Sequence, residues 1–403
     1  MKRRTVLAGL AGTAATASLI RPARAVTVGV TKTEIKIGST TAFSGPASAY
    51  SIGAKAVMAY MKKINAEGGI NGRKINLLMY DDGYNPAKTV EMTRKLVEQD
   101  EVAFLLAQLG TAPNSAIHKY VNGKKVPHLF VATGAAKWGD PEHYPWTIGW
   151  NPNYRTEGQI YAKYMLRERP NGKIAILYQN DDLGRDYVDG VRDVLGKDYE
   201  KRVIRAVSYE VTDATVDSQV ASLADSGADC LISASTPKFG AQLIRKAYDI
   251  GWQPLHCMTN VTSSVSTVMK PAGAQKGIGI ITSTYVKDPN DPTWAKDPAM
   301  IEWRAFVEKW GEGLLDGNDV NCFVGLGYAR TGLQVVRQCG DDLSRENIMR
   351  QAANIKNLDV GVLFPGILVN TSPTNFRPIT QMQLTRWNGE FWERFGGLLE
   401  GSA

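Results

Sequence analysis

The sequence predicts an α/β protein with two doubly wound lobes. Short apolar runs of strand-like composition alternate with longer runs whose apolar residues recur every three or four positions. This alternation is typical of parallel sheets covered by helices on both faces. The rhythm is interrupted once, at Asp140–Asn153, where Pro141, Pro145 and Pro152 occur without a helical pattern. We interpret this interruption as a crossover from one α/β lobe to a second.

The expected strands are runs of five to eight residues that end at small or polar residues. They cover Glu34–Thr41, Lys74–Asp81, Val102–Ala107, His128–Ala132, Lys173–Tyr178, Arg202–Tyr209, Asp229–Ala234, Leu255–Thr259 and Gly277–Thr284. Between them lie runs with the helical period, which bury one apolar face against a sheet. These runs are Gly53–Ala66, Ala87–Gln99, Tyr154–Arg167, Tyr187–Leu195 and Lys238–Ile250.

The last hundred residues depart from this alternation. From Trp294 the chain is mostly helical, over roughly 297–312, 319–338 and 344–356, by the same periodicity. Two alternating runs then flank Asn388-Gly389, which is a strong hairpin signal. We expect the late helices to return to the first lobe and the hairpin to complete the second. The lobes would then comprise 26–149 with 282–380, and 150–281 with 381–403.

The positive net charge of the chain indicates an export signal rather than a polyanionic binding partner. The 403 residues are 43% hydrophobic and 22% charged, which excludes a disordered, collagen-like or purely coiled-coil protein. The formal net charge of +7 would suggest a polyanionic partner if it were spread over the fold. Instead Lys2, Arg3 and Arg4 precede a mildly apolar run, and Arg21–Ala25 ends in an A-x-A pattern. This pattern indicates a signal peptide cleaved after Ala25 and export to the periplasm.

The paired arginines and weak hydrophobicity favour the twin-arginine export route, although Val6 replaces the usual Phe and leaves the general route open. Removal of residues 1–25 takes away five basic residues and no acidic one, leaving 378 residues with a net charge of +2. No later run of about 18 apolar residues occurs, so we expect a soluble mature protein. Val26 in place of Cys excludes a lipoprotein anchor at this cleavage site.

Four cysteines do not make a disulfide scaffold, even in an oxidising compartment. Cys322 and Cys339 fall on one predicted helix, about 25 Å apart at 1.5 Å per residue, which is too far to bridge. Cys230 and Cys257 each fall in a predicted strand. A bridge between these two stays open, but we favour buried free thiols.

Polar loops follow the predicted strands in both halves of the chain. They are Ala42–Pro46, Gln108–Pro113, Thr133–Trp138, Asn180–Gly184, Ser235–Pro237 and Asn260–Thr262. Ligands bind at the carboxyl ends of parallel strands, where hydroxyls and the N–H groups of helix starts can donate hydrogen bonds to a carboxylate. Thr111, followed by Pro113, is interpreted as a helix N-cap. Any single loop could owe this composition to turn geometry, but such loops in both lobes favour a binding cleft between them.

Signals for catalysis, metals and cofactors are weak. The four histidines have no metal-ligand spacing, and neither a nucleophile elbow nor a phosphate loop occurs. Gly325-Leu326-Gly327 with Gly332 lies in a helical run rather than after a strand, so we do not expect it to bind a dinucleotide. We interpret Asp81-Asp82 and Asp181-Asp182 as helix caps or lobe–lobe hydrogen-bond acceptors. We therefore expect no enzyme activity, no metal and no cofactor.

Three motifs in series resemble a known family. They are Thr-Ala-Phe-Ser-Gly-Pro (41–46), Ile-Asn-Ala-Glu-Gly-Gly-Ile-Asn-Gly-Arg (64–73) and Tyr-Asp-Asp-Gly-Tyr-Asn-Pro-Ala-Lys (80–88). The chain is similar to periplasmic solute-binding proteins of the branched-chain amino-acid-binding type, the receptors of ABC importers. The resemblance implies two Rossmann-like lobes joined by three hinge crossovers and closing on a small molecule. It also implies a monomer that engages the importer's membrane permease subunits and no nucleic acid.

The resemblance also implies a ligand site, which this sequence matches in part. Thr111 matches the family's carboxylate donor, and Thr133, Gly134 and Ala135 match its backbone donors, with Ala136 at a position that often carries a hydroxyl. Asn260 replaces the acidic residue that holds an amino acid's ammonium, and Ser235 or Thr236 replaces an aromatic residue. A buried ammonium without an anion is costly, whereas an amide serves a hydroxyl or carbonyl. We therefore expect an aromatic or other apolar acid that lacks an α-ammonium.

Aromatic candidates for the wall of the site are Tyr50, Trp138 and Tyr285, each of which could equally be scaffold, while we place Tyr154 on a helix face. The cysteines that some relatives pair are Gly83 and Gly110 here, so that bridge is not expected. The complete set of expected ligand-binding residues is Ser44, Tyr50, Gln108, Leu109, Thr111, Thr133, Gly134, Ala135, Trp138, Asp181, Leu183, Ser235, Thr236, Asn260 and Tyr285.

Three alternatives remain at this point. The first is an amino-acid receptor of the same fold that neutralises the ammonium with Asp181 or Asp182. The second is an exported α/β hydrolase, which the absence of a nucleophile elbow disfavours. The third is a sensor or repressor core, which the export signal and the lack of a preceding DNA-binding helix pair disfavour.

Overall fold

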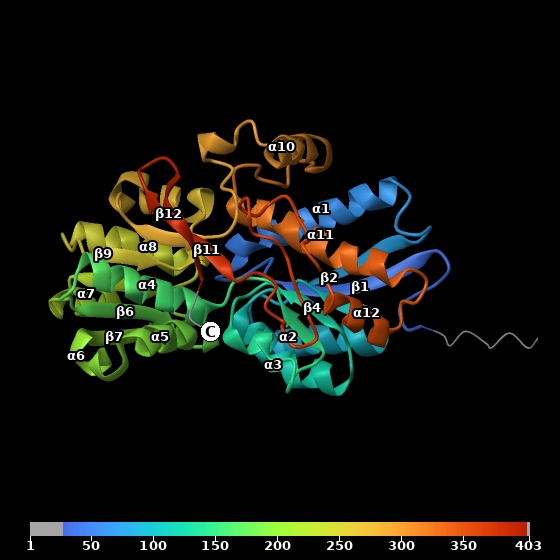
Figure 1. The fold of residues 1–403 in the computed structure, drawn as a ribbon, viewed down its shortest axis with the longest axis horizontal. Coiled ribbons are helices and arrows are strands. Elements are labelled where there is room, and N and C mark those ends of the chain that lie inside the picture. The colour runs from blue at the N-terminus through green and yellow to red at the C-terminus, as the bar shows by residue number, and fades with distance from the viewer. Residues whose placement is uncertain (1–26, 401–403) are drawn as a thin grey trace, which may run out of the picture.

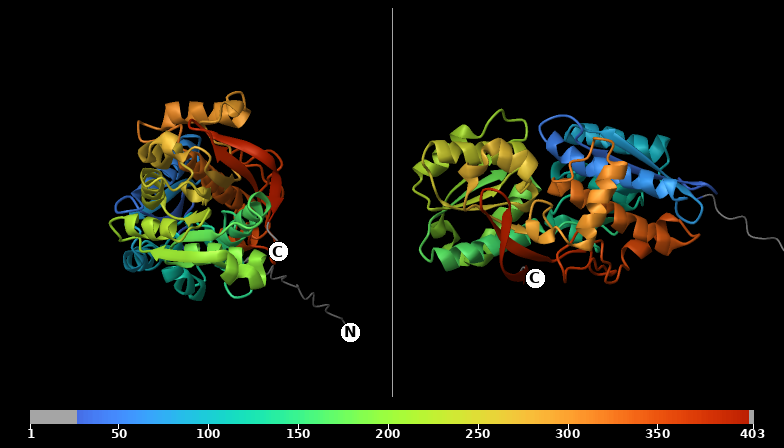
Figure 2. Two further views of the ribbon diagram at one scale, coloured as in Figure 1. Left: turned by 90° about the vertical axis from the view of Figure 1, so that its left-hand side faces the viewer. Right: turned by 90° about the horizontal axis from the view of Figure 1, so that it is seen from above.

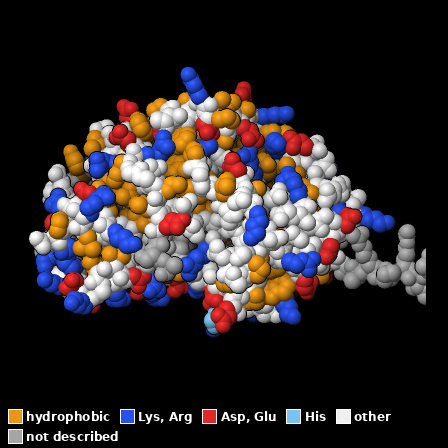
Figure 3. Space-filling model, viewed as in Figure 1, with side chains coloured by type: hydrophobic (Ala, Val, Ile, Leu, Met, Phe, Trp, Pro, Cys, Tyr) orange, Lys and Arg blue, Asp and Glu red, His pale blue; other side chains and the backbone are white. Residues whose placement is uncertain are grey.

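The computed structural model describes residues 27–400, which fold into two α/β lobes, each with its own sheet (Figure 1). The expected signal peptide, residues 1–25, lies outside the described residues. On the face shown in Figure 3, basic and acidic side chains are interspersed rather than gathered into one field. Within residues 27–400, no helix is long and apolar enough to span a membrane.

The sheet of the first lobe is parallel throughout and has the order β2-β1-β3-β4-β5. Its strands are β1 (Glu34–Thr41), β2 (Lys74–Asp81), β3 (Phe104–Leu106), β4 (His128–Val131) and β5 (Thr147–Gly149). The first two coincide with the predicted runs. The edge strand β5 was not predicted, because three residues beside Pro141 and Pro145 carry no readable alternation. The passage to the second lobe therefore starts only after Gly149.

Helices cover both faces of this sheet, as expected. On one face lie α1 (Ser51–Ala66) and α11 (Val320–Cys339), and on the other lie α2 (Pro86–Arg94) and α3 (Thr111–Gly123) (Figures 1 and 2). The late helices α10 (Pro298–Trp310), α11 and α12 (Arg345–Ala352) lie beside the N-terminal elements. After Gly149, the chain therefore passes between the lobes twice more. It leaves the second sheet between β10 and α10, and it returns to that sheet before β11.

The glycines of α11 serve this packing. A Cβ on Gly325 would lie 2.2 Å from the carbonyl oxygen of Gly53, so only glycine lets α11 approach α1 so closely. A Cβ on Gly327 would lie 2.8 Å from the Trp150 ring, and one on Gly332 would lie 2.6 Å from Leu106. The glycine pattern of α11 therefore serves helix packing.

The second sheet has the order β12-β11-β10-β9-β8-β6-β7. Its strands are β6 (Ile174–Gln179), β7 (Val203–Tyr209), β8 (Cys230–Ala234), β9 (Leu255–Met258), β10 (Ile281–Thr284), β11 (Gln381–Trp387) and β12 (Trp392–Glu400). Strands β6 to β10 are parallel, and the hairpin β11–β12 adds to β10 in antiparallel orientation. Gly389 turns this hairpin with φ +105°, which confirms the prediction from Asn388-Gly389.

The helices of the second lobe are α4 (Tyr154–Glu168), α5 (Asp182–Leu195), α6 (Tyr199–Arg202), α7 (Asp217–Asp225), α8 (Pro237–Asp249) and α9 (Lys270–Ala272). The lobe boundary expected after residue 281 falls inside β10, whose residues all pair within the second sheet. The division of the remaining chain between lobes stays a prediction. All four cysteines are buried free thiols, and Cys322 and Cys339 both lie on α11.

Candidate ligand-binding site

A cavity of about 730 Å³, counted with the part that opens to solvent, lies between the lobes at the carboxyl ends of their strands. Its lining combines five tyrosines, five hydroxyl residues, three asparagines and nine small or aliphatic residues. They are Tyr50, Tyr84, Tyr154, Tyr285 and Tyr328; Thr111, Thr133, Thr236, Ser263 and Thr284; Asn151, Asn260 and Asn321; and Gly53, Leu109, Gly110, Ala132, Leu183, Val261, Val286, Val320 and Val324. None of these lining residues is Asp, Glu, Lys, Arg or His.

Eight of the fifteen predicted ligand residues line this cavity. They are Tyr50, Leu109, Thr111, Thr133, Leu183, Thr236, Asn260 and Tyr285. They come from both lobes and from the connection after β10, so the structure brings together side chains that lie up to 235 positions apart in sequence. Their contact with a ligand stays a prediction.

The other seven predicted residues do not line the cavity, and the first four of them are Ser44, Gln108, Asp181 and Ser235. Ser44 is exposed, and its hydroxyl donates to Asp81 Oδ2 at 2.6 Å. The Gln108 amide donates inside the lobe to Thr40, at 3.0 Å. Asp181 caps α5 by accepting from the Leu183 and Gly184 N–H groups, as the capping interpretation expected. Ser235 is buried, and its hydroxyl has no partner among residues 27–400.

The remaining three, Gly134, Ala135 and Trp138, follow β4 and do not line the cavity. The Trp138 ring is buried inside the first lobe, with its centroid 4.9 Å from that of His118. Ala135 is buried beside it, and the Gly134 carbonyl accepts from the Tyr154 N–H at 2.8 Å. This loop turns away from the cavity after Thr133, because the short helical turn at Ala136–Gly139 carries Trp138 into the core.

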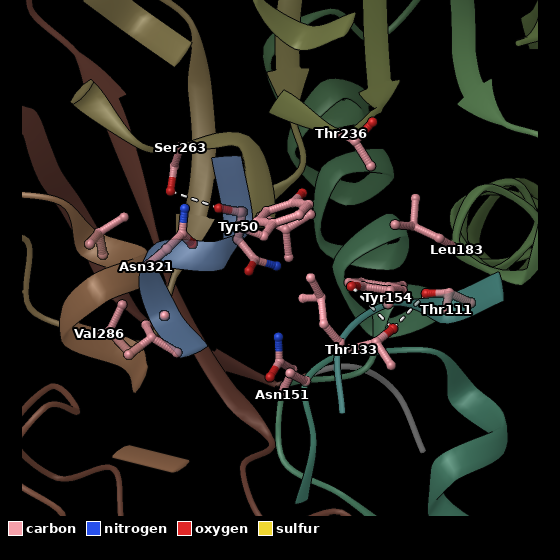
Figure 4. Close-up of a pocket in the computed structure, with 18 of the residues that line it drawn as sticks. Tyr50, Thr111, Thr133, Asn151, Tyr154, Leu183, Thr236, Ser263, Val286 and Asn321 are labelled. Carbon is pink, nitrogen blue, oxygen red and sulfur yellow. Dashed lines mark hydrogen bonds between the residues drawn. The ribbon is translucent and has the colours of Figure 1, made fainter. Parts of the chain in front are cut away.

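A cluster of hydroxyls, from Thr111 and Thr133 of the first lobe and from Tyr154 of α4, faces the cavity. The Thr111 and Thr133 hydroxyl oxygens are 2.5 Å apart, and the Tyr154 hydroxyl lies 3.5 Å from Thr133 (Figure 4). Tyr154 lies on a helix as predicted, but it is the first residue of α4, which begins at the cavity, so its side chain also lines the cavity. Burial raises the pKa of Tyr154 to about 12, so its phenol stays neutral and able to donate.

The start of α3 adds backbone donors to this cluster. Gly110, with φ +95°, is the N-cap, and Thr111 is the first helical residue, which corrects the expected cap. A Cβ on Gly110 would lie 2.4 Å from the Tyr84 ring, which packs there. Thr111 does not cap the helix, and its hydroxyl instead pairs with that of Thr133 at the cavity. Helix starts leave N–H groups without intrahelical partners and carry partial positive charge, so this corner suits a carboxylate.

Asn151, which the sequence did not single out, faces the cavity from the crossover between the lobes. Its Oδ1 accepts from the Tyr328 hydroxyl at 2.7 Å, and Figure 4 shows its amide nitrogen turned into the cavity. Tyr328 in turn packs against Trp150, with ring centroids 4.7 Å apart. Crossover residues have no periodic signal, and only the tertiary fold brings α11 against them.

The second lobe places a buried carboxylate behind the cavity. Glu157, on α4, is 0% exposed and accepts hydrogen bonds from the Tyr161 and Tyr187 hydroxyls. It also accepts from the backbone N–H of Asn260 at 2.8 Å and from the Asn260 side-chain amide. Burial raises the pKa of Glu157, and these donors oppose that rise. Its position on a helix face gave the sequence no signal for this role.

Hydrogen bonds join the lobes on both sides of the cavity. On one side the Lys137 ammonium lies 2.7 Å from Asp182, and the Ala136 N–H donates to Asp186 Oδ2 at 2.7 Å. On the other side the Ser264 hydroxyl donates to Asp319 at 2.6 Å. These contacts show that the lobes are closed, and they match the lobe–lobe interpretation of Asp182. Within residues 27–400, no cluster of three or more His, Cys, Asp or Glu side chains could hold a metal ion.

Comparison with known proteins agrees with this architecture. Residues 34–391 match a family model described as "Periplasmic binding protein". A "Leu/Ile/Val-binding protein homolog 7" of Brucella abortus is 21% identical over 366 residues, covering 88% of this chain and 89% of the relative.

Two solved structures show the same fold. A branched-chain amino-acid ABC transporter protein of Thermus thermophilus with bound valine has a TM-score of 0.82, at 16% identity over 93% of this chain and 98% of its own. An ABC-transporter solute-binding protein of R. palustris in complex with benzoate has a TM-score of 0.75, at 18% identity over 92% and 97%.

Proposed function

Because the chain belongs to the periplasmic binding protein family of ABC transporters, we propose that it captures a small carboxylic acid without an α-ammonium group. The ligand would be enclosed between the lobes. The observation that carries this proposal is the uncharged lining, in which hydroxyls and a helix start adjoin tyrosines and aliphatic side chains.

The carboxylate would dock in the first lobe. Thr111 and Thr133 offer two hydroxyls, and the first turn of α3 offers N–H groups and the positive end of its dipole. Such neutral donors bind an anion without requiring a second buried charge. The body of the ligand would then contact Tyr50, Tyr285 and Leu183, whose apolar surfaces suit an aromatic ring or a branched chain.

An ammonium has no matching partner in the cavity. At the position where the family resemblance implies an acid, Asn260 offers only an amide. The carboxylate nearest to it, Glu157, lies behind the lining and already accepts from four donors. Burying an ammonium among neutral groups would cost on the order of several kcal/mol of binding free energy, because its desolvation is not offset by a nearby anion.

The proposed role is transport rather than catalysis. Members of this family bind solutes and deliver them to the permease subunits of an importer, and we propose the same for this chain. The closed lobes would be the form that the permease engages, stabilised by differential affinity for the ligand. Export would remove residues 1–25, so mass spectrometry of the periplasmic protein is expected to find Val26 as its first residue.

Isothermal titration calorimetry with benzoate, 4-hydroxycinnamate and leucine tests the ligand class. We expect at least one of the two aromatic acids to bind and leucine not to bind. The same ligands can be ranked by thermal shift, because a ligand at a hundredfold excess over its Kd stabilises the protein by about 2.7 kcal/mol. Tight binding of leucine together with no response to either acid would overturn the proposal.

A further inference from the structure

The Asn151 and Asn260 side chains face the cavity with opposite hydrogen-bonding groups, because each has one end engaged elsewhere. Asn151 Oδ1 accepts from the Tyr328 hydroxyl, so its Nδ2 is the group left for the cavity (Figure 4). The Asn260 Nδ2 donates to Glu157, so its Oδ1 is the acceptor left for a ligand. Asn151 can therefore donate a hydrogen bond to an acceptor on the ligand, and Asn260 can accept one from a donor on the ligand.

The orientation of Asn260 follows from the hydrogen bonds of Glu157. The Tyr161 hydroxyl and the Asn260 backbone N–H reach Oε1, while the Tyr187 hydroxyl and the Asn260 amide reach Oε2. A carboxylate only accepts hydrogen bonds, so its neighbours contact it through their donors, although the Tyr161 hydroxyl also lies 2.6 Å from the Met258 carbonyl oxygen. The end of Asn260 that meets Glu157 is therefore its NH₂ group.

This orientation is held firmly. Glu157 is fully buried, and the ring of Tyr187 stacks on both neighbouring tyrosines, Tyr154 and Tyr161. A rotation of the Asn260 amide would place its carbonyl against the carboxylate and leave that oxygen one donor short. Leaving a buried charged group under-bonded costs several kcal/mol, by about the penalty for unsatisfied buried groups. The acceptor is thus presented to the cavity before any ligand arrives.

We propose that the ligand is a hydroxy acid, whose carboxylate meets Thr111, Thr133 and Asn151 and whose hydroxyl donates to Asn260 Oδ1. Glu157 is the positioning residue that sets this preference. The inference rests on the proposed function, since it assigns the second polar group of the same ligand. A hydroxyl satisfies the amide oxygen without burying a charge, whereas a hydrogen at that position leaves the oxygen unpaired.

Two ligand triads test this directly, because their members differ in a single group. The first is leucine, 2-hydroxy-4-methylpentanoate and 4-methylpentanoate, and the second is phenylglycine, mandelate and phenylacetate. Both enantiomers of each chiral ligand are titrated calorimetrically into the full mature protein. In at least one triad we expect the hydroxy acid to bind about tenfold or more tightly than the acid without the hydroxyl.

The outcomes separate this inference from the proposed function. Equal affinities for the hydroxy acids and their deoxy counterparts, with no amino-acid binding, would overturn the hydroxyl assignment and leave the function standing. Tight binding of an amino acid alone would overturn both. Absence of binding by every member of both triads would also overturn the hydroxy-acid assignment.

Two variants identify the residues responsible. In Glu157→Gln, the glutamine NH₂ is expected to turn Asn260 so that its amide nitrogen faces the cavity, which removes the preference for the hydroxyl. Asn151→Leu is the matched control, and it is expected to weaken the hydroxy and deoxy acids by the same factor. A retained hydroxyl preference in a folded Glu157→Gln protein would overturn the positioning role.

Discussion

The two halves of the cleft use polar groups differently. In the first lobe, the Thr111 and Thr133 hydroxyls contact each other and lie beside a helix start, with neither a carboxylate nor an ammonium among their hydrogen-bond partners. In the second lobe, Asn260 is fixed by a buried carboxylate and two tyrosines. Hydroxyls can rotate to suit an incoming anion, whereas the Asn260 amide has one permitted orientation. The first lobe therefore suits docking of an acid, and the second suits discrimination among acids.

The largest expected effect comes from removing the buried carboxylate. Glu157→Leu removes the acceptor of the Asn260 N–H and amide, while the Tyr161 and Tyr187 hydroxyls keep the Met258 carbonyl and the Thr259 hydroxyl as partners. We expect a loss of about 3–5 kcal/mol in the free energy of unfolding. Urea denaturation followed by tryptophan fluorescence measures it. Glu157→Gln serves as the milder control, and a loss below about 1 kcal/mol in the leucine variant would contradict the network.

Removing a first-lobe hydroxyl is expected to affect binding rather than stability. Thr111→Val deletes a donor to the ligand carboxylate, a hydrogen bond of about 1.5–3 kcal/mol, so affinity should fall roughly 10- to 100-fold. Calorimetry with the tightest acid measures this change. Ser44→Ala is the matched control, since the Ser44 hydroxyl is engaged with Asp81 at the surface and its loss should leave affinity unchanged. A stability loss without an affinity loss would assign Thr111 to the scaffold.

The pH dependence of binding tests whether closure of the lobes raises the pKa of acidic side chains between them. Burial raises the pKa of Asp186 to about 7 in this closed form, with the Ala136 N–H and Arg155 opposing the rise and Asp182 and Asp189 adding to it. In an open form its pKa should lie nearer the usual 3.8, so the closed form binds a proton more tightly. Protonation of Asp186 therefore stabilises the closed form. This stabilisation has its full value below the pKa of the open form and is lost as the pH rises through about 7.

Affinity for an acid should consequently be greater at pH 5.5 than at pH 8, by roughly 10- to 30-fold. Titrations across this range in Asp186→Asn should give a flat profile, because the amide does not titrate. An unchanged slope in that variant would show that the dependence arises elsewhere, for example from Asp181, whose pKa burial raises to about 6.

The smallest effect is expected at the rim. Lys137 and Asp182 are each about one-third exposed, so solvent screens their ion pair and its contribution should be below about 1 kcal/mol. Lys137→Met should therefore lower affinity less than about fivefold, and added salt should erase even that difference. A loss above tenfold that persists at high salt would place the energy of closure at the rim instead of in the cleft.

The sequence by itself determined the alternation of strands and helices, the mostly helical segment after Trp294 and the terminal hairpin. Each rests on a local property, either the 2.0- or 3.6-residue period or the turn chemistry of Asn388-Gly389. The same local reasoning placed Thr111, Thr133 and Asn260 at the ends of strands, where a parallel sheet must gather them.

Only the tertiary structure decided which side chains reach the cavity. Trp138 and Tyr154 are both aromatic residues near strand or helix ends, yet one is folded into the core and the other faces the cavity. Asn151 and Glu157 carry no local signal, because their roles depend on Tyr328 and Tyr187 from distant segments. Periodicity indicates which face of an element is buried, but the direction of a hydrogen bond is set by whichever partner the fold brings against it.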